Sequence, residues 1–84
     1  MTEAVGETLL DLRGMRCPWP AIRVARAIRE AAATGEGGAV ILAVADDPVA
    51  PREIGAVAQE RGWVVSAHDT AIGPALRLSL ADKT

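Results

Sequence analysis

Residues that commonly fill cores or carry chemistry are scarce in this sequence. It contains no Phe and no Tyr, and only two Trp, one Cys and one His. The core must therefore be thin and largely aliphatic. A single cysteine excludes an internal disulfide and is typical of a reducing compartment, which predicts a cytoplasmic protein. One Cys and one His do not provide the several ligands of a metal site, so we expect no bound metal.

Net charge and apolar run length are also small. The formal net charge is -2, so we expect no direct binding to nucleic acid or to an anionic membrane. The longest purely apolar stretch, Ala39–Ala45, is about a third of a membrane span, and no signal segment is visible between Met1 and Glu7. The length of 84 residues predicts a single domain at residues 1–84, with its core at about residues 8–81.

Apolar periodicity switches between strand-like and helix-like segments along the chain. The pattern predicts a strand at Thr8–Leu12, a helix at Pro18–Ala33, a strand at Ala39–Ala45, a helix from Pro48 to Arg61, and strands at Trp63–His68 and Ala75–Leu80. This order predicts a two-layer α/β sandwich, βαβαββ, with a mixed four-stranded sheet and two helices on one face. The other face would be uncovered, and we expect Ile41 and Ala43 to point towards it.

The lone thiol occupies a predicted strand-to-helix junction, in the tetrapeptide Cys17-Pro18-Trp19-Pro20. If Pro18 is the first helical residue, Cys17 is the N-cap and its sulfur lies near the positive end of the helix dipole, which predicts a lowered pKa. The prolines stiffen the loop and leave the N–H groups of Trp19 and Ala21 to face a sulfur anion. We therefore favour an activated nucleophile over an inert buried cysteine.

Other uses of a lone nucleophile fit the sequence less well. His68 falls in a predicted strand with no visible Cys–His pairing, which disfavours a hydrolytic triad. Cys17 and Arg23 have the C-x5-R spacing of cysteine phosphatases, but Pro18 and Pro20 remove amide donors that a phosphate cradle requires. No phosphate-binding or dinucleotide-binding glycine motif is present, so we expect no cofactor.

Charged residues flank the thiol in sequence or in the predicted fold. Arg13 and Arg16 are close enough to Cys17 to add positive charge, although their side chains could equally point into solvent. Asp47 is predicted to cap the second helix. Because both motifs occupy strand-to-helix turns at one end of the sheet, Asp47 could also lie at the rim of the cysteine site.

These motifs together resemble the TusA/SirA-like family of sulfur carriers. The segment LDLRGMRCPWP at residues 10–20, then Asp46-Asp47-Pro48 and Ile54, follow the family's order and spacing, and the similarity spans roughly residues 10–80. The resemblance implies a fold like the C-terminal domain of translation initiation factor three and a persulfide on Cys17. It also implies a cysteine desulfurase or rhodanese as donor, and acceptors in tRNA thiolation, molybdenum-cofactor or sulfur-oxidation pathways. Any pyridoxal phosphate would belong to the donor.

Two features depart from the family pattern. Many relatives carry Glu between the prolines where this chain has Trp19, and the connection at Thr34–Gly38 is slightly longer. A helical projection places Trp19 near Arg23 and Arg26, on the outer face. Trp19 could be an interface hot spot or could form a local cation–π pair with Arg23. The arginines could dock an acidic partner or simply be solvated.

A function of another class is compatible with the same residues. The chain could be a non-catalytic interaction or regulatory domain that binds through Trp19 and the uncovered sheet face. RNA binding is disfavoured, because the charge is not basic and a G-x-x-G clamp is missing.

Overall fold

Two helices and four strands follow one another in the predicted order. The computed structural model describes residues 7–34 and 39–80, so Gly35–Gly38 of the connection at Thr34–Gly38 and Ala81 at the end of the predicted core lie outside them. The elements are β1 (Glu7–Asp11), α1 (Trp19–Thr34), β2 (Val40–Val44), α2 (Ala50–Glu60), β3 (Trp63–Thr70) and β4 (Gly73–Leu80). Within the described residues, neither helix is long and apolar enough to cross a bilayer.

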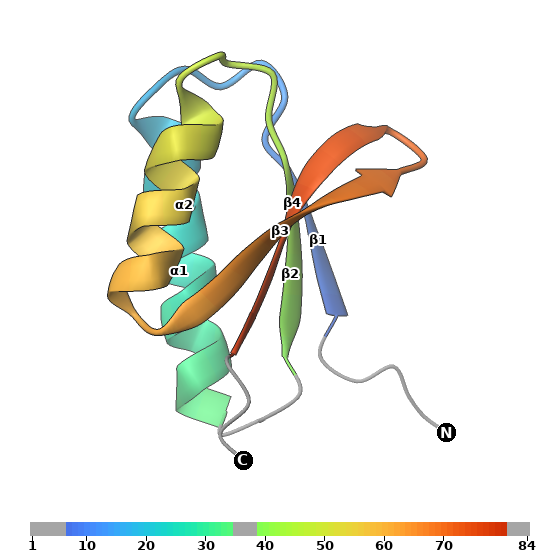
Figure 1. The fold of residues 1–84 in the computed structure, drawn as a ribbon. Helices are drawn as coiled ribbons and strands as arrows, with labels where there is room; N and C mark the ends of the chain where they lie inside the picture. The colour runs from blue at the N-terminus through green and yellow to red at the C-terminus, as the bar shows by residue number, and fades with distance from the viewer. Residues whose placement is uncertain (1–6, 35–38, 81–84) are drawn as a thin grey trace.

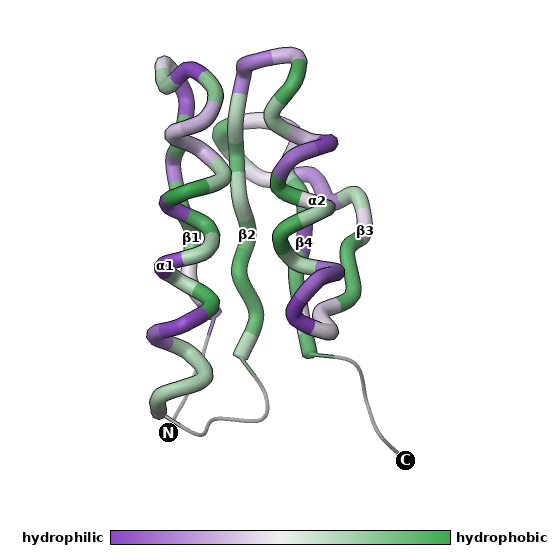
Figure 2. The backbone as a smooth tube through the Cα atoms, turned by 90° about the vertical axis from the view of Figure 1, so that its left-hand side faces the viewer, coloured by the Kyte–Doolittle hydropathy of each residue, from purple (hydrophilic) through white to green (hydrophobic). Residues whose placement is uncertain are grey.

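The sheet has the strand order β1-β2-β4-β3. Strands β1 and β2 run parallel, and β4 runs antiparallel to both β2 and β3. Figure 1 shows both helices on one side of the sheet, and the perpendicular view in Figure 2 shows α1 over the β1 side and α2 over the β3 side. The predicted two-layer α/β sandwich with a mixed four-stranded sheet is confirmed.

The core lies between the helices and the sheet. Aliphatic side chains dominate it, and Trp63 at the start of β3 is its single large aromatic residue among those described. Val24 and Ile28 of α1 and Ile54 and Ala58 of α2 are at most 2% exposed, as the helical stripes predict. The helices are therefore held to the sheet by contacts between aliphatic side chains rather than by a large aromatic cluster.

Strand β2 is buried on both sides. The residues that face the helices are the ones that the sequence analysis predicted to face away from them. Ile41 and Ala43, expected on the uncovered face, are each 2% exposed and belong to the helix-facing core. Ala43 pairs with Leu76 of β4, which packs on the same core. Because side chains alternate along a strand, Leu42 and Val44 point to the other face. The unbroken apolar run VILAV contains no alternation that could fix the side from sequence.

Strands β3 and β4 are longer than predicted, and only Ala71 and Ile72 form the turn between them. The Thr70 hydroxyl donates to the Gly73 carbonyl at 2.7 Å and accepts the Ile72 N–H at 3.3 Å. The hairpin tip lies on the side of the sheet away from the helices (Figure 1). A Cβ added to Gly73 would lie 3.9 Å from the Val44 side chain, so the hairpin passes close to Val44, which is buried on the face that lacks helices.

Candidate functional site

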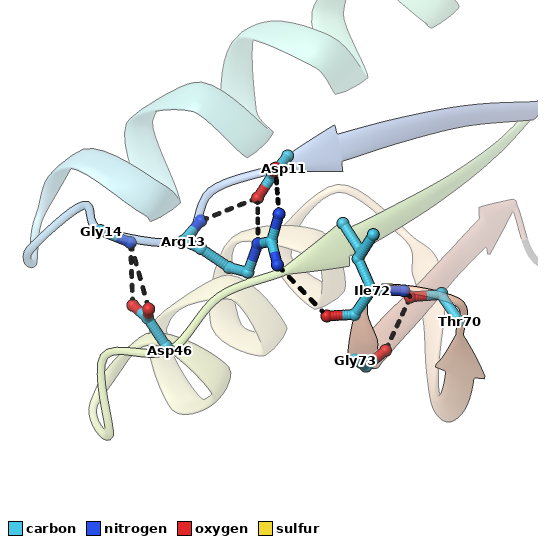
Figure 3. A network of polar contacts seen from close by, with 7 residues as sticks. All are labelled: Asp11, Arg13, Gly14, Asp46, Thr70, Ile72 and Gly73. Carbon is cyan, nitrogen blue, oxygen red and sulfur yellow. Dashed lines mark hydrogen bonds and ion pairs between the residues drawn. The ribbon is translucent and has the colours of Figure 1, made fainter.

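Two strand-to-helix junctions lie side by side at one end of the sheet. We call residues 12–18, between β1 and α1, the thiol junction, and residues 45–49, between β2 and α2, the acidic junction. The Gly14 N–H donates to both carboxylate oxygens of Asp46, at 3.0 and 3.2 Å (Figure 3). The Cys17 N–H donates to Asp47 Oδ2 at 2.9 Å. The two motifs are therefore joined directly, because the parallel strands β1 and β2 end together.

Asp47 bonds across the junctions as well as to the segment that leads into its own helix. The α2 helix begins at Ala50, two residues later than predicted, and its N-cap Val49 makes no side-chain capping bond. The second carboxylate oxygen of Asp47 accepts the Val49 N–H at 2.9 Å. Bonds from Cys17 first and then Val49 hold the pKa of Asp47 below its ordinary value. The carboxylate thus fixes both the thiol junction and the start of α2.

Pro18 separates Cys17 from Trp19, the first residue of α1, so Cys17 is not the N-cap that the sequence predicts. The peptide bond between Cys17 and Pro18 is cis, and the Pro18 carbonyl accepts the Ile22 N–H at 3.1 Å, the first turn's i to i-4 bond. The Trp19 N–H, expected to face the sulfur, instead donates to the Arg16 carbonyl at 2.9 Å. The predicted support of the sulfur by that amide is therefore wrong.

The thiol is exposed, but its pKa is raised rather than lowered. The Cys17 sulfur donates to Glu53 Oε1 at 2.8 Å, and this bond is the main reason that the thiol pKa lies above its ordinary value. Desolvation and the negative charges of Glu53 and Asp47 act in the same direction. The expectation of a helix-activated thiolate fails because Glu53 bonds the sulfur directly and Asp47 adds a second negative charge nearby.

The two arginines of the thiol junction have different surroundings. Arg13 forms a two-pronged ion pair with Asp11, both contacts at 2.8 Å, and its third nitrogen reaches the Ile72 carbonyl at 3.5 Å (Figure 3). Its charge is therefore committed to the junction and the hairpin tip rather than to the sulfur. Arg16 is exposed, and its charge contributes to the lowered pKa of Asp47.

Exposed apolar side chains lie near the thiol junction. Trp19, Ile22 and Val49 are 59%, 47% and 46% exposed, and Val49 shares the Asp47 carboxylate with Cys17. Pro20, by contrast, is fully buried and anchors the first turn of α1. The outer position predicted for Trp19 is confirmed by its exposure.

Farther along α1, Arg23 and Arg26 line a shallow surface hollow with Leu10, Ala27 and Glu30. Arg26 also pairs with Glu30 at 3.2 Å, one helical turn away. Such an exposed pair is weak, so both arginines stay available to solvent or to a partner. Within residues 7–34 and 39–80, no three His, Cys, Asp or Glu side chains gather as metal ligands would.

Glu53 is the site residue that sequence reasoning missed. It lies in the first turn of α2, where an acidic residue is ordinarily explained by the helix dipole. Its distance of 36 residues from Cys17 leaves no local pattern between them. The only available signal was topological, since a residue one turn into α2 lies at the same sheet end as the thiol.

The chain is also similar to known proteins, in sequence and in fold. The family model described as sulfurtransferase TusA matches residues 8–79 of the chain. A crystal structure of a SirA-like protein from Desulfitobacterium hafniense is similar, with a TM-score of 0.69 and 24% sequence identity. The match covers 90% of this chain and 99% of that one. This structural likeness supports the same fold.

Proposed function

Because the chain belongs to the TusA family of sulfurtransferases, we propose that Cys17 accepts sulfur as a persulfide and passes it to a partner protein. Members of this family work in sulfur relay with partner proteins. The observation that carries the proposal is the exposed Cys17 sulfur on a junction held by Asp46 and Asp47. The Pro18 and Pro20 pair, with Arg16 alongside, completes the rigid support that we assign to this loop.

Loading of Cys17 is a single sulfur exchange. The thiol gives up its proton, Sγ attacks the outer sulfur of a donor persulfide R–S–SH, and a new Sγ–S bond forms as the donor S–S bond breaks. The donor leaves as R–S⁻, so the exchange needs no outside oxidant or reductant. The reverse sequence on an acceptor thiol unloads the carrier. Such chemistry requires one accessible sulfur and no cofactor in this chain.

We assign partner docking to the surface around the thiol. Trp19 and Ile22 supply exposed apolar area beside Cys17, and Trp is enriched among residues that dominate interfaces. Arg23 and Arg26 add positive charge on the outer face of α1, which fits a partner with an acidic rim. A cysteine desulfurase or a rhodanese is the expected donor class. Acceptors in tRNA thiolation, molybdenum-cofactor or sulfur-oxidation pathways fit the same carrier chemistry.

The cellular setting follows from the thiol rather than from the fold. A carrier with a free, exposed sulfur needs a reducing compartment, because oxidising compartments convert such thiols to disulfides. We therefore place the relay in the cytoplasm, without direct contact to membrane or nucleic acid.

The test uses Cys17→Ser in a reconstituted transfer from a cysteine desulfurase supplied with radiosulfur-labelled cysteine. Wild-type chain should acquire label that a reductant removes, and Cys17→Ser should acquire none. Binding of the donor should be nearly unchanged in Cys17→Ser and weakened in Trp19→Ala. Label retained by Cys17→Ser would refute the carrier proposal.

A non-catalytic interaction domain is the second candidate, favoured by one observation. Leu9 and Val64 on the helix-free sheet face are 49% and 50% exposed, which leaves apolar surface far from the thiol. Donor binding without any sulfur acquisition by the wild-type chain would favour this second function.

A further inference from the structure

Glu53 and Cys17 form a direct contact between α2 and the thiol junction. Glu53 Oε1 lies 2.8 Å from the Cys17 sulfur, within the reach required of a group that exchanges a proton with a nucleophile. The Glu53 side chain is half-buried while the thiol is exposed. The sulfur therefore contacts the carboxylate while Cys17 as a whole stays exposed and accessible to a donor.

We propose that Glu53 is the general base that takes the Cys17 proton while Sγ attacks the donor persulfide. In this step Cys17–SH, Glu53–COO⁻ and R–S–SH become Cys17–S–SH, Glu53–COOH and R–S⁻, so atoms and charge balance. The proposal rests on the carrier function of Cys17. It adds the residue that makes loading feasible from a thiol that is mostly protonated.

The other charged groups near the sulfur are committed elsewhere. Both oxygens of Asp47 accept backbone N–H groups, from Cys17 and Val49. Asp46 accepts the Gly14 N–H through both of its oxygens. The positive charge on the thiol's own loop, Arg16, acts on Asp47. Among the described residues, Glu53 is thus the carboxylate placed on the sulfur itself.

The Glu53 charge has two opposite consequences for Cys17. It disfavours the thiolate at rest, yet it supplies an acceptor for the proton during attack. The two charges are in direct contact at the protein surface, so removal of the Glu53 charge should raise the thiolate fraction by about tenfold. Loss of a general base typically lowers a rate by about 100-fold or more. Removal of the base should therefore dominate, and sulfur loading should slow although more thiolate is present.

The experiment compares wild type with Glu53→Gln, whose amide oxygen can still accept the S–H bond. Glutathione persulfide serves as the donor, and loading is followed as the gain of one sulfur atom in the intact mass. The thiolate fraction is titrated separately by its ultraviolet absorbance. Near neutral pH, Glu53→Gln should show a higher thiolate fraction and a loading rate lower by about tenfold to 100-fold.

Controls separate this role from folding and from the carrier function. Glu60→Gln alters another acid of α2, which contacts Arg61 at 3.6 Å near the opposite end of the helix, and should load like wild type. Helicity by circular dichroism should match in all three proteins. Across pH, the loading rate of Glu53→Gln should be proportional to its thiolate fraction. The loading rate of the wild type should be higher than its own thiolate fraction alone would give.

Two outcomes have distinct meanings. If Glu53→Gln loads in proportion to its increased thiolate, or faster than wild type, Glu53 is not the base although Cys17 remains a carrier. If wild-type chain gains no sulfur at Cys17, as judged against Cys17→Ser, the carrier function itself fails and the base has no reaction to serve.

Discussion

The thiol junction and the acidic junction occupy equivalent places in the fold but supply opposite groups. Residues 12–18 contribute backbone donors, at Gly14 and Cys17, whereas residues 45–49 contribute the carboxylates that accept them. Neither junction places its polar side chain at the N-cap of its own helix. Each junction is therefore completed by its neighbour, and the state of the thiol depends on residues far away in sequence.

The same comparison explains why the Cys17 pKa is raised. A thiol at a helix start is activated when the helix amides face it, but here the Trp19 amide is turned to Arg16. The acidic junction and α2 instead present Asp47 and Glu53 to the sulfur. A site built this way keeps its thiol protonated at rest, so under the proposed carrier function its reactivity comes from a proton acceptor or from the bound partner.

The largest expected effect tests how the thiol junction is anchored. Leu12 is fully buried, and its N–H donates to the Val44 carbonyl at 2.7 Å. Leu12→Ala should lower the free energy of unfolding by about 3 kcal/mol, because it leaves a cavity beneath the junction. The matched change in the acidic junction, Ala45→Gly, removes one methyl group from a half-buried residue and should cost less than about 1 kcal/mol. Urea unfolding measures both.

Similar losses for the two variants would contradict the view that the thiol junction carries the apolar anchor. A small loss in both would mean that the junctions are held mainly by their polar bonds. The ratio of the two losses in free energy of unfolding, rather than either loss alone, therefore tests whether the thiol junction carries more of the apolar anchoring than the acidic junction does.

A smaller effect should separate the two aspartates of the acidic junction. Asp47 uses one oxygen for Cys17 and the other for Val49, whereas both oxygens of Asp46 converge on Gly14. Asn retains a single acceptor oxygen, so Asp47→Asn must lose one bond while Asp46→Asn keeps one. Asp47→Asn should raise hydrogen exchange of the Cys17 or Val49 amide by roughly tenfold. Asp46→Asn should change exchange at Gly14 by less than about threefold.

Nuclear magnetic resonance resolves these amides individually, and sulfur loading by glutathione persulfide provides a second measurement. Loading should slow in Asp47→Asn if the freed amide is that of Cys17, because the sulfur is then less well positioned. If both variants exchanged all three amides at the wild-type rates, the carboxylates would not hold the thiol junction.

Much of the fold was predictable because local patterns agree with it. Element order, the helical stripes of Val24 and Ile54, and the meeting of the Cys17 and Asp47 motifs follow from periodicity and from the parallel pairing of β1 with β2. The sides of β2 were not predictable. Its apolar run has no alternation, and only the register of Ala43 with Leu76 decides which residues face the helices.

The chemistry of the site was less predictable than its location. Sequence identifies Cys17, but the direction of its pKa shift depends on Glu53, whose bond to the sulfur spans 36 positions. The extent of the β3–β4 hairpin was also missed. Side-chain bonds of Thr70 close the turn within two residues, whereas the strands predicted at Trp63–His68 and Ala75–Leu80 leave a longer loop between them.

The smallest expected effect is a loss of stability in acid that both junctions share. The pKa of Asp11 is lowered to about 2 by its bonds with Arg13, and that of Asp47 is lowered by the Cys17 and Val49 amides. Both groups bind protons more weakly when folded, so their stabilisation is present above the unfolded-state pKa and is lost as the pH falls through the folded-state pKa. The urea midpoint should therefore decline between about pH 4 and about pH 2.

Single substitutions assign this acid sensitivity to each junction. Asp11→Asn removes the contribution of the β1 carboxylate that pairs with Arg13 of the thiol junction, and Asp47→Asn removes that of the acidic junction, so each should flatten part of the decline. The bonds of Asp47 hold both junctions, whereas Asp11 pairs with Arg13 two residues away. By linkage, however, the flattening scales with the shift in pKa, and the pKa of Asp11 is the one lowered as far as about 2. We therefore expect the larger flattening in Asp11→Asn, with Asp69→Asn on β3 as the control outside both junctions. An acid decline as steep in Asp47→Asn as in wild type would show that this carboxylate holds no bond that matters to the fold.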